Sequence, residues 1–123
     1  MFKNIHRLLT ILSFFFPLLV YVLTMAPTTS FWDCGEFIST SYILGVPHPP
    51  GSPFYLLLGN VFSSIPFFSD IGARVNLISP ITSAFSVMFL YLIIVYLIEE
   101  FYGRVKNFSD CLVVYASSII AAL

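Results

Sequence analysis

Two long apolar segments constrain the fold of this chain more than any other feature of its sequence. Leu8–Met25 and Val75–Ile98 are almost wholly apolar. As helices they would reach roughly 27 and 36 Å, and the hydrocarbon layer of a membrane is about 30 Å thick. The composition agrees, because 59% of the 123 residues are hydrophobic and only 9% are charged. A soluble domain carries roughly 25% charged residues, so we expect an all-α, polytopic integral membrane protein.

The distribution of basic residues predicts the orientation in the membrane. Basic residues precede the first apolar segment and follow the second, whereas residues 26–73 contain no Lys or Arg. Because cytoplasmic loops are enriched in basic residues, we expect the N-terminus and residues 99–110 in the cytoplasm and residues 26–74 outside. The basic residues on which this orientation rests are Lys3, Arg7, Arg104 and Lys106.

We therefore expect a single, incomplete transmembrane domain. A cleaved signal peptide is the alternative for the first span, but Pro27 directly after the weak cleavage-like sequence disfavours cleavage. The last apolar run is only about 20 Å long as a helix and cannot cross a bilayer. We expect the native polypeptide to continue past Leu123, with a re-entrant end as the alternative. The expected parts are span 8–25, outer loop 26–74, span 75–98, inner loop 99–110 and truncated span 111–123.

The outer loop carries its own helix signals. Ser30, with Asp33 three residues later, has the capping-box spacing and predicts a helix over Phe31–Leu44 that Gly45 ends. Ser52 and the following proline predict the N-cap and first residue of a second helix, which Pro66 ends. We expect this second helix to lie along the outer membrane surface. Its predicted apolar face holds Phe54, Leu57, Leu58, Val61, Phe62 and Ile65, and its polar face holds Asn60, Ser63 and Ser64.

Four residues of the outer loop could carry chemistry. Asp33 and Glu36 follow the first span and share one face of a helix, and charge so close to lipid is usually paired or functional. The alternative is that Asp33 caps a helix and that Glu36 is a solvated loop residue. His48 lies among three prolines that present it rigidly, unless Pro47–Gly51 is a plain connector. Arg74, the only cation of the loop, suits a lipid phosphate or an interfacial anchor.

The remaining composition excludes other classes of protein. The formal net charge of −1, without a basic patch, argues against a nucleic-acid partner. Cys34 and Cys111 form no CxxC pattern, so a zinc or redox site is not expected. Since the expected orientation puts these two cysteines on opposite sides of the membrane, a disulfide between them is not expected either.

Several motifs together resemble a known membrane family. The combination of Trp-Asp-Cys-Gly-Glu with His-Pro-Pro-Gly is the most specific of them. These motifs are similar to the N-terminal part of a bacterial membrane family of unknown function. That family is related to the eukaryotic transmembrane protein O-mannosyltransferases, within the glycosyltransferases of the GT-C fold. The resemblance covers most of Leu8–Ile98 and rests on Thr24–Thr28, Phe31–Phe37, Gly45–Pro53 and Arg74–Leu77.

The resemblance implies the N-terminal part of a GT-C-type transmembrane fold with a helical outer loop, in the bacterial cytoplasmic membrane. It implies a glycosyltransferase that moves mannose or a similar sugar from a polyprenyl-phosphate donor to an outward-facing protein or glycan acceptor. Asp33 matches the family's catalytic acid, with Glu36 as its neighbour, and His48, Arg74 and Trp32 are the expected donor-binding residues. No cofactor is certain, since the lipid-linked sugar is a substrate. A divalent metal held by the two carboxylates and the histidine stays open.

Two other classes of function stay open. A transporter or channel component needs ionisable groups deep in its spans, and neither complete apolar segment has one. A non-catalytic assembly or anchoring protein would use the outer loop as a docking surface. That class predicts that Asp33→Asn is harmless and that changes on the apolar face of Phe54–Ile65 matter. The glycosyltransferase predicts the opposite.

Overall fold

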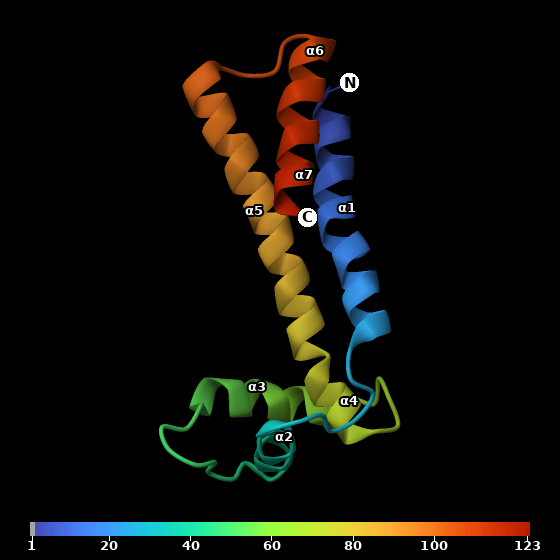
Figure 1. The fold of residues 1–123 in the computed structure, drawn as a ribbon, viewed down its shortest axis with the longest axis vertical. Coiled ribbons are helices and arrows are strands. Elements are labelled where there is room, and N and C mark those ends of the chain that lie inside the picture. Colours follow the sequence, from blue (N-terminus) through green and yellow to red (C-terminus); the bar gives the residue numbers. More distant parts are fainter. Residues whose placement is uncertain (1) are drawn as a thin grey trace. The chain divides into compact units, whose positions relative to one another are not determined.

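The computed structural model describes residues 2–123, and helices dominate this part of the chain (Figure 1). No strand occurs among the described residues, so the all-α prediction is confirmed. Two helical stretches, Lys3–Thr24 and Ile71–Tyr102, are long and apolar enough to cross a membrane. The described residues divide into two compact units. The first comprises residues 2–21 and 81–123, and the second comprises Val22–Pro80.

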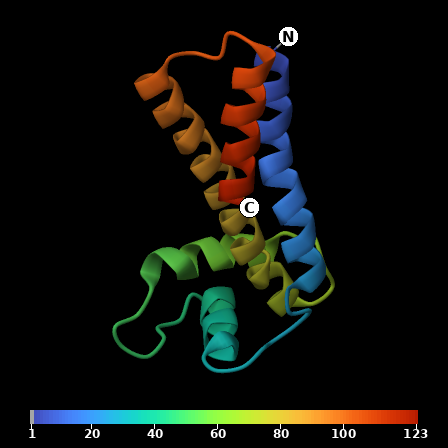
Figure 2. The same ribbon diagram turned by 45° about the horizontal axis from the view of Figure 1, so that its top comes forward.

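The first unit contains the helices of the apolar segments. Its core gathers Tyr91 and Val95 with Cys111, Val114 and Tyr115. α1 and the segment from α6 to α7 lie side by side in both views (Figures 1 and 2). The elements are α1 (Phe2–Thr24), α5 (Ile78–Tyr102), α6 (Phe108–Cys111), the π-helical turn η1 (Leu112–Ala116) and α7 (Ser117–Ala122).

The helices of both apolar segments extend at one end beyond the ranges expected from hydropathy. α1 starts at Phe2 and is continuous through Pro17. α5 continues to Tyr102, where Gly103 with φ 90° ends it, so only residues 103–107 separate it from α6. Asp110 explains the early start of α6, because its carboxylate accepts the backbone N–H of Asn107 at 3.2 Å. Both ends of the expected inner loop are therefore helical, and its basic residues Arg104 and Lys106 lie in the connection between the two helices.

The second unit holds three helices that carry and support the candidate site. They are α2 (Cys34–Ile43), α3 (Pro53–Ser64) and α4 (Ile71–Asn76). α2 starts three residues later than expected, so Ser30 as its N-cap is wrong. Trp32 has φ 62°, a left-handed conformation that a right-handed helix cannot include. Asp33 takes the N-cap position instead, but its side chain makes no capping hydrogen bond.

The end of α2 also differs from the expectation by one residue. Leu44, not Gly45, adopts the left-handed conformation, with φ 52°. The N–H of Leu44 donates to the carbonyl of Ser41 at 3.4 Å, and that of Gly45 donates to the carbonyl of Thr40 at 2.8 Å. These two bonds satisfy carbonyls that the end of a helix otherwise leaves open.

α3 begins at Pro53 after Ser52 at the N-cap position, as expected, although Ser52 makes no side-chain capping bond. Part of its polar side, Asn60 and Ser63, faces the protein, whereas Ser64 is exposed. Ser63 is buried, and the Asn60 amide donates to the carbonyls of Ser41 and Tyr42 at 3.0 and 3.1 Å. The apolar face is divided between the inside and the outside. Its partly buried members are Leu58 and Phe62, and its exposed members are Phe54, Leu57, Val61 and Ile65.

α2 and α3 approach each other closely at Gly59. A Cβ atom added at Gly59 would lie 2.8 Å from the Cβ of Ser41, which is fully buried. Glycine is therefore required for the two helices to pack at this distance.

The second apolar segment begins in α4 and continues in α5, with a break between the two helices at Leu77. α4 ends at Asn76 and α5 starts at Ile78, three residues after the expected start at Val75. Val75 is fully buried and belongs to the core of the second unit, with Ile38 and Ile78. The side chain of Asp70 caps α4 by accepting the N–H of Ala73 at 3.0 Å. The first part of the apolar segment therefore packs within the outer-loop unit.

Candidate functional site

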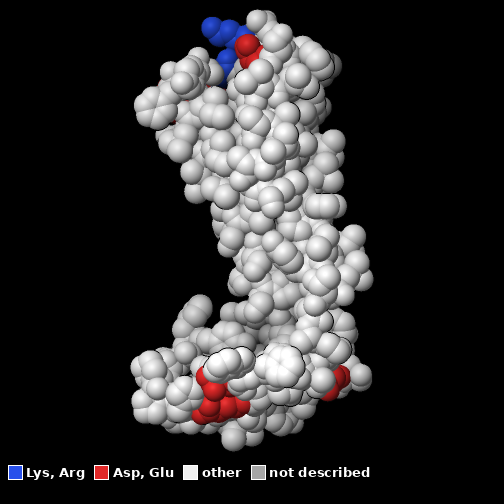
Figure 3. All heavy atoms as spheres, viewed as in Figure 1, with Lys and Arg blue, Asp and Glu red and all other residues white. Residues whose placement is uncertain are grey.

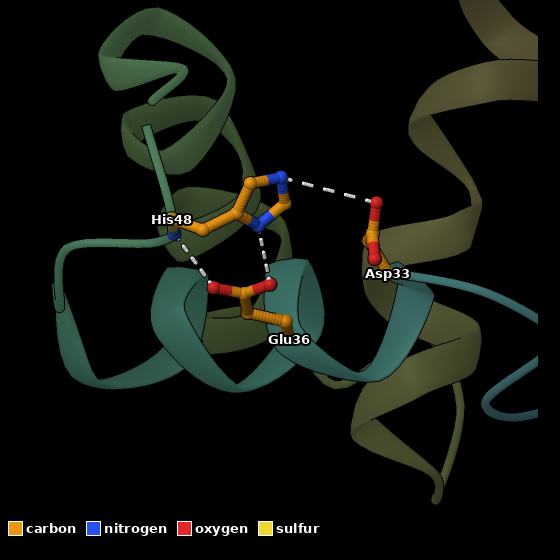
Figure 4. A group of neighbouring side chains, drawn as sticks. All are labelled: Asp33, Glu36 and His48. Carbon is orange, nitrogen blue, oxygen red and sulfur yellow. Dashed lines mark hydrogen bonds and ion pairs between the residues drawn. The ribbon is translucent and has the colours of Figure 1, made fainter. Parts of the chain in front are cut away.

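Three of the predicted site residues lie together in the second unit. Asp33 precedes α2, Glu36 lies in its first turn, and His48 lies in the loop between α2 and α3. Figure 4 shows the imidazole of His48 between the two carboxylates. Because Asp33 and Glu36 are three residues apart at the start of a helix, both can face the same loop.

Glu36 holds His48 by two hydrogen bonds. One carboxylate oxygen accepts the backbone N–H of His48 at 2.7 Å, and the other contacts the ring nitrogen Nδ1 at 2.7 Å (Figure 4). An ionised carboxylate can only accept, so Nδ1 carries the proton. The two bonds together determine both the position of the loop and the orientation of the ring.

The second ring nitrogen of His48 faces Asp33. Nε2 lies 4.0 Å from the Oδ2 atom of Asp33. The side chain of His48 is 50% exposed and that of Asp33 is 60% exposed, so a substrate can reach both groups. The ring of Phe37 meets the imidazole edge-on, with 6.2 Å between the ring centroids.

The contact between Glu36 and His48 changes the pKa of both groups. The hydrogen bond from the ring of His48, followed by that from its backbone, lowers the pKa of Glu36 below 4.5. The hydrogen bond and the negative charge of Glu36 raise the pKa of His48 above 6.5. The site therefore favours an imidazolium between two carboxylates over a wider pH range than a free histidine would allow.

The loop conformation around His48 follows from its sequence. The peptide bond between Pro49 and Pro50 is cis, and Gly51 has φ 75°, a conformation that glycine adopts at little cost. The N–H of Gly51 donates to the carbonyl of His48 at 3.0 Å and closes a turn. Prolines and glycine thus form a tight turn that presents the histidine to α2.

Two residues that the sequence interpretation did not single out position the segment before Asp33. The amide of Asn76 donates to the carbonyls of Ala26 and Thr28 at 3.0 and 2.9 Å. Asp70 accepts the hydroxyl of Thr28 at 3.2 Å. Asn76 belongs to the Arg-Val-Asn-Leu motif, which was a signal available in the sequence. Asp70 is separated from Thr28 by 42 residues, and no local pattern links them.

The other two predicted donor-binding residues have different surroundings. The guanidinium of Arg74 donates to the backbone carbonyls of Phe68, Ser63 and Ser69 at 2.6, 3.0 and 3.3 Å. These bonds hold the turn between α3 and α4. Trp32 is 95% exposed, so its indole has few contacts within the described residues. The structure thus gathers Asp33, Glu36 and His48, and gives Arg74 structural partners.

The same three side chains are also the group best suited to hold a metal ion among the described residues. One ligand atom from each lies within 4.8 Å of the other two. In such a site Nε2 of His48 and the carboxylate of Asp33 would be ligands. Glu36, already bound to Nδ1, would orient the imidazole, as carboxylates commonly do behind a metal-binding histidine. Two protein ligands suit a loosely held ion that keeps several waters.

A cavity of about 320 Å³ lies beside the site. It is lined by Cys34, Phe37, Ser52 and Tyr55. Phe37 also contacts the ring of Tyr55 edge-on, with centroids 5.7 Å apart. Since Phe37 contacts His48 as well, the aromatic wall of the cavity continues to the acid–histidine cluster.

The two long apolar helices indicate an α-helical protein of the membrane-associated class. Residues 33–123 match the family described as Protein O-mannosyl-transferase TMEM260 N-terminal domain. The chain belongs to this family. The predicted relation to protein O-mannosyltransferases is confirmed, whereas the bacterial membrane and the GT-C fold stay predictions. The matched region begins at Asp33, so it includes Glu36, His48 and Arg74 and leaves out Trp32.

Two curated relatives carry the same name. The chain is 31% identical to Protein O-mannosyl-transferase tmem260 of Dictyostelium discoideum over 84 residues, which cover 67% of this chain and 10% of the relative. It is 33% identical to Protein O-mannosyl-transferase TMEM260 of Mus musculus over 72 residues, which cover 58% of this chain and 10% of the relative. The aligned part of the chain thus spans about a tenth of the length of these relatives. No solved structure matches the chain significantly.

Proposed function

We propose that this chain is the N-terminal part of a membrane glycosyltransferase. It would transfer a sugar, with mannose as the first candidate, from a polyprenyl-phosphate donor to an outward-facing protein or glycan acceptor. The single observation that carries the proposal is the cluster in which Glu36 holds His48 and turns Nε2 toward Asp33. The names of the relatives support the choice of mannose.

Asp33 is the proposed general base. Its side chain is 60% exposed and makes no capping hydrogen bond, so a substrate hydroxyl can approach it. The hydroxyl oxygen forms a bond to C1 of the sugar, and its proton passes to Asp33. The bond between C1 and the phosphate oxygen breaks, and its electron pair leaves with the lipid phosphate. Attack opposite the leaving group inverts the configuration at C1.

His48 is the proposed group that meets the leaving phosphate. The phosphate gains negative charge as the bond to the sugar breaks, and a fixed cation or N–H donor stabilises that charge. Because Glu36 raises the pKa of His48 and holds its ring, the imidazolium is present and oriented before the donor binds. Arg74 ranks behind His48 as a donor contact, because its guanidinium already binds three carbonyls.

The cavity beside the cluster supports a sugar substrate. Its volume of about 320 Å³ falls at the lower end of the range for small-molecule sites, which is roughly 300–1,000 Å³. The aromatic rings of Phe37 and Tyr55 can face the apolar surface of a pyranose, and the Ser52 hydroxyl can bond to a sugar hydroxyl. Trp32, exposed next to Asp33, offers a further ring for the same purpose.

A transfer assay tests the proposal. The full-length protein is expressed in membranes with a labelled polyprenyl-phosphate mannose, and transfer to acceptor is measured at matched protein levels. We expect Asp33→Asn to reduce transfer at least about 100-fold, the lower range for loss of a general base. Glu100→Gln is the matched control, because Glu100 is an exposed acid outside the cluster. Equal transfer by wild type and Asp33→Asn would remove Asp33 from the mechanism.

The exposed apolar residues of α3 favour one other function, the assembly or anchoring role. Phe54, Leu57 and Val61 are 81%, 60% and 56% exposed, and an apolar face of this kind is typical of a helix that contacts lipid or a partner. Leu57→Ser separates the two functions. An anchoring protein loses its membrane partner with Leu57→Ser and is unaffected by Asp33→Asn, whereas the glycosyltransferase shows its larger loss with Asp33→Asn.

A further inference from the structure

A second cavity lies in the first unit, where α1 begins and α5 ends. Its volume is about 440 Å³. Figure 3 shows Lys and Arg atoms gathered at this end of the unit, with one acidic group beside them. Three cations and one acid line the cavity, and they come from α1, from α5 and from the loop 103–107. They are Lys3, Arg7, Arg104 and Glu99.

Within the described residues, the cations of this cavity form no ion pair with an acid. Among residues 2–123, both ion pairs within 4.0 Å belong to His48 in the other unit, so none includes Lys3, Arg7 or Arg104. Glu99 lies close to the hydroxyl of Tyr115. The cavity thus has a surplus of positive charge, which an anion can compensate.

The wall of the cavity is held in place by aromatic contacts. Nδ1 of His6 lies 3.1 Å from the hydroxyl oxygen of Tyr91, and the ring of His6 stacks on Tyr115 with centroids 5.3 Å apart. Tyr91 is fully buried and Tyr115 is 5% exposed. Through these contacts α1 packs against α5 and η1, so the helices that carry the cations are fixed relative to one another.

An apolar groove of about 220 Å³ adjoins the cationic cavity. Tyr115 lines both hollows. The groove follows α1 on one side and the segment from α6 to α7 on the other, and no charged residue lines it. Its other lining residues include Ile5, Leu9, Leu112, Ala116 and Ile119.

We propose that this pair of hollows binds an anionic phospholipid, with the headgroup phosphate in the cationic cavity and part of an acyl chain in the apolar groove. Arginine and lysine suit phosphate oxygens, and the groove suits a hydrocarbon chain. A soluble phosphate compound would use only the first hollow, so the groove favours a lipid. The predicted orientation puts this end at the cytoplasmic leaflet, which is rich in anionic lipids. The inference does not depend on the proposed sugar transfer.

Native mass spectrometry of the full-length protein in detergent tests the inference. The protein is titrated with phosphatidylglycerol, with phosphatidylcholine of the same acyl chains, and with glycerol phosphate. We expect phosphatidylglycerol to bind at least about tenfold more tightly than phosphatidylcholine, because each basic residue near an anionic lipid adds severalfold to the affinity. If glycerol phosphate bound as tightly as phosphatidylglycerol, the inference would be overturned, because the apolar groove would then contribute nothing to the affinity.

Two variants and one control distinguish this site from a general attraction of basic residues to anionic lipid. Arg7→Gln removes one cation of the cavity, and Ile119→Phe fills the groove without changing the charge. Both should weaken phosphatidylglycerol binding severalfold. Lys106→Gln is the matched control. Lys106 is an exposed cation in the same loop as Arg104, residues 103–107, but it does not line the cavity. An equal loss with Lys106→Gln, or no loss with Ile119→Phe, would refute the proposed site.

Discussion

Replacing Arg74 by Met should destabilise the outer-loop unit even without substrate. The guanidinium donates three hydrogen bonds, to the carbonyls of Ser63, Phe68 and Ser69. A hydrogen bond to a charged group contributes about 1.5 kcal/mol or more, and one to a carbonyl that water can reach contributes less. Only the bond to Ser63 is partly buried. With about 1.5 kcal/mol for that bond and about 0.5 for each of the others, we expect a loss of about 2.5 kcal/mol.

The measurement is thermal unfolding of the purified full-length protein in detergent, followed by the reactivity of Cys34. Cys34 is half-buried beside Asn76, with Sγ 3.7 Å from its amide oxygen, so it reacts faster when the unit opens. Arg74→Lys should give an intermediate loss, because an ammonium cannot reproduce the fork of a guanidinium. Lys106→Met is the control for removal of an exposed cation. An unchanged unfolding midpoint for Arg74→Met would refute the structural role and restore Arg74 as a free donor-binding residue.

Three further predictions concern the cluster and the helix crossing. Glu36→Gln should lower the pKa of His48 toward 6.5, measured by NMR titration of the imidazole, and an unchanged value would contradict the contact. The Glu36–His48 pair should contribute fully to stability between about pH 4.5 and 6.5. Its contribution should fade as the pH rises through the raised pKa of His48 or falls through the lowered pKa of Glu36, so the difference between the unfolding midpoints of wild type and Glu36→Gln should shrink at both extremes. Gly59→Ala should lower the free energy of unfolding by about 1–3 kcal/mol, because its new Cβ would clash with Ser41. Denaturation experiments measure this loss. Gly45→Ala is the control and should have little effect, because its new Cβ would lie 3.4 Å from Ile43.

The candidate site was predictable in part because its residues carry local signals. Asp33 and Glu36 are three residues apart, and His48 is surrounded by prolines, so each was recognisable from its neighbours. The sequence did not show that these three side chains lie close together. Their proximity depends on the return of the chain after α2, where Leu44 takes a left-handed conformation and the loop brings His48 back to the first turn of the helix.

The capping role considered for Asp33 failed for a similar reason. The capping-box spacing from Ser30 assumes helical backbone through Trp32, but Trp32 is left-handed and α2 begins at Cys34. Asn76 and Asp70 hold the preceding segment by contacts across more than 40 residues. The motif around Asn76 was visible in the sequence, but no local pattern shows which distant residues Asn76 and Asp70 contact.

The sequence by itself determined the class of this protein. Two apolar segments of sufficient length require helices, because an isolated helix satisfies its own backbone hydrogen bonds in lipid. The tertiary structure decided which polar groups act together. In the folded chain Glu36 contacts Nδ1 of His48 at 2.7 Å, and the guanidinium of Arg74 donates hydrogen bonds to three carbonyls. The physical reason is that hydropathy depends on composition along the chain, whereas a hydrogen bond depends on where the folded backbone brings two distant groups.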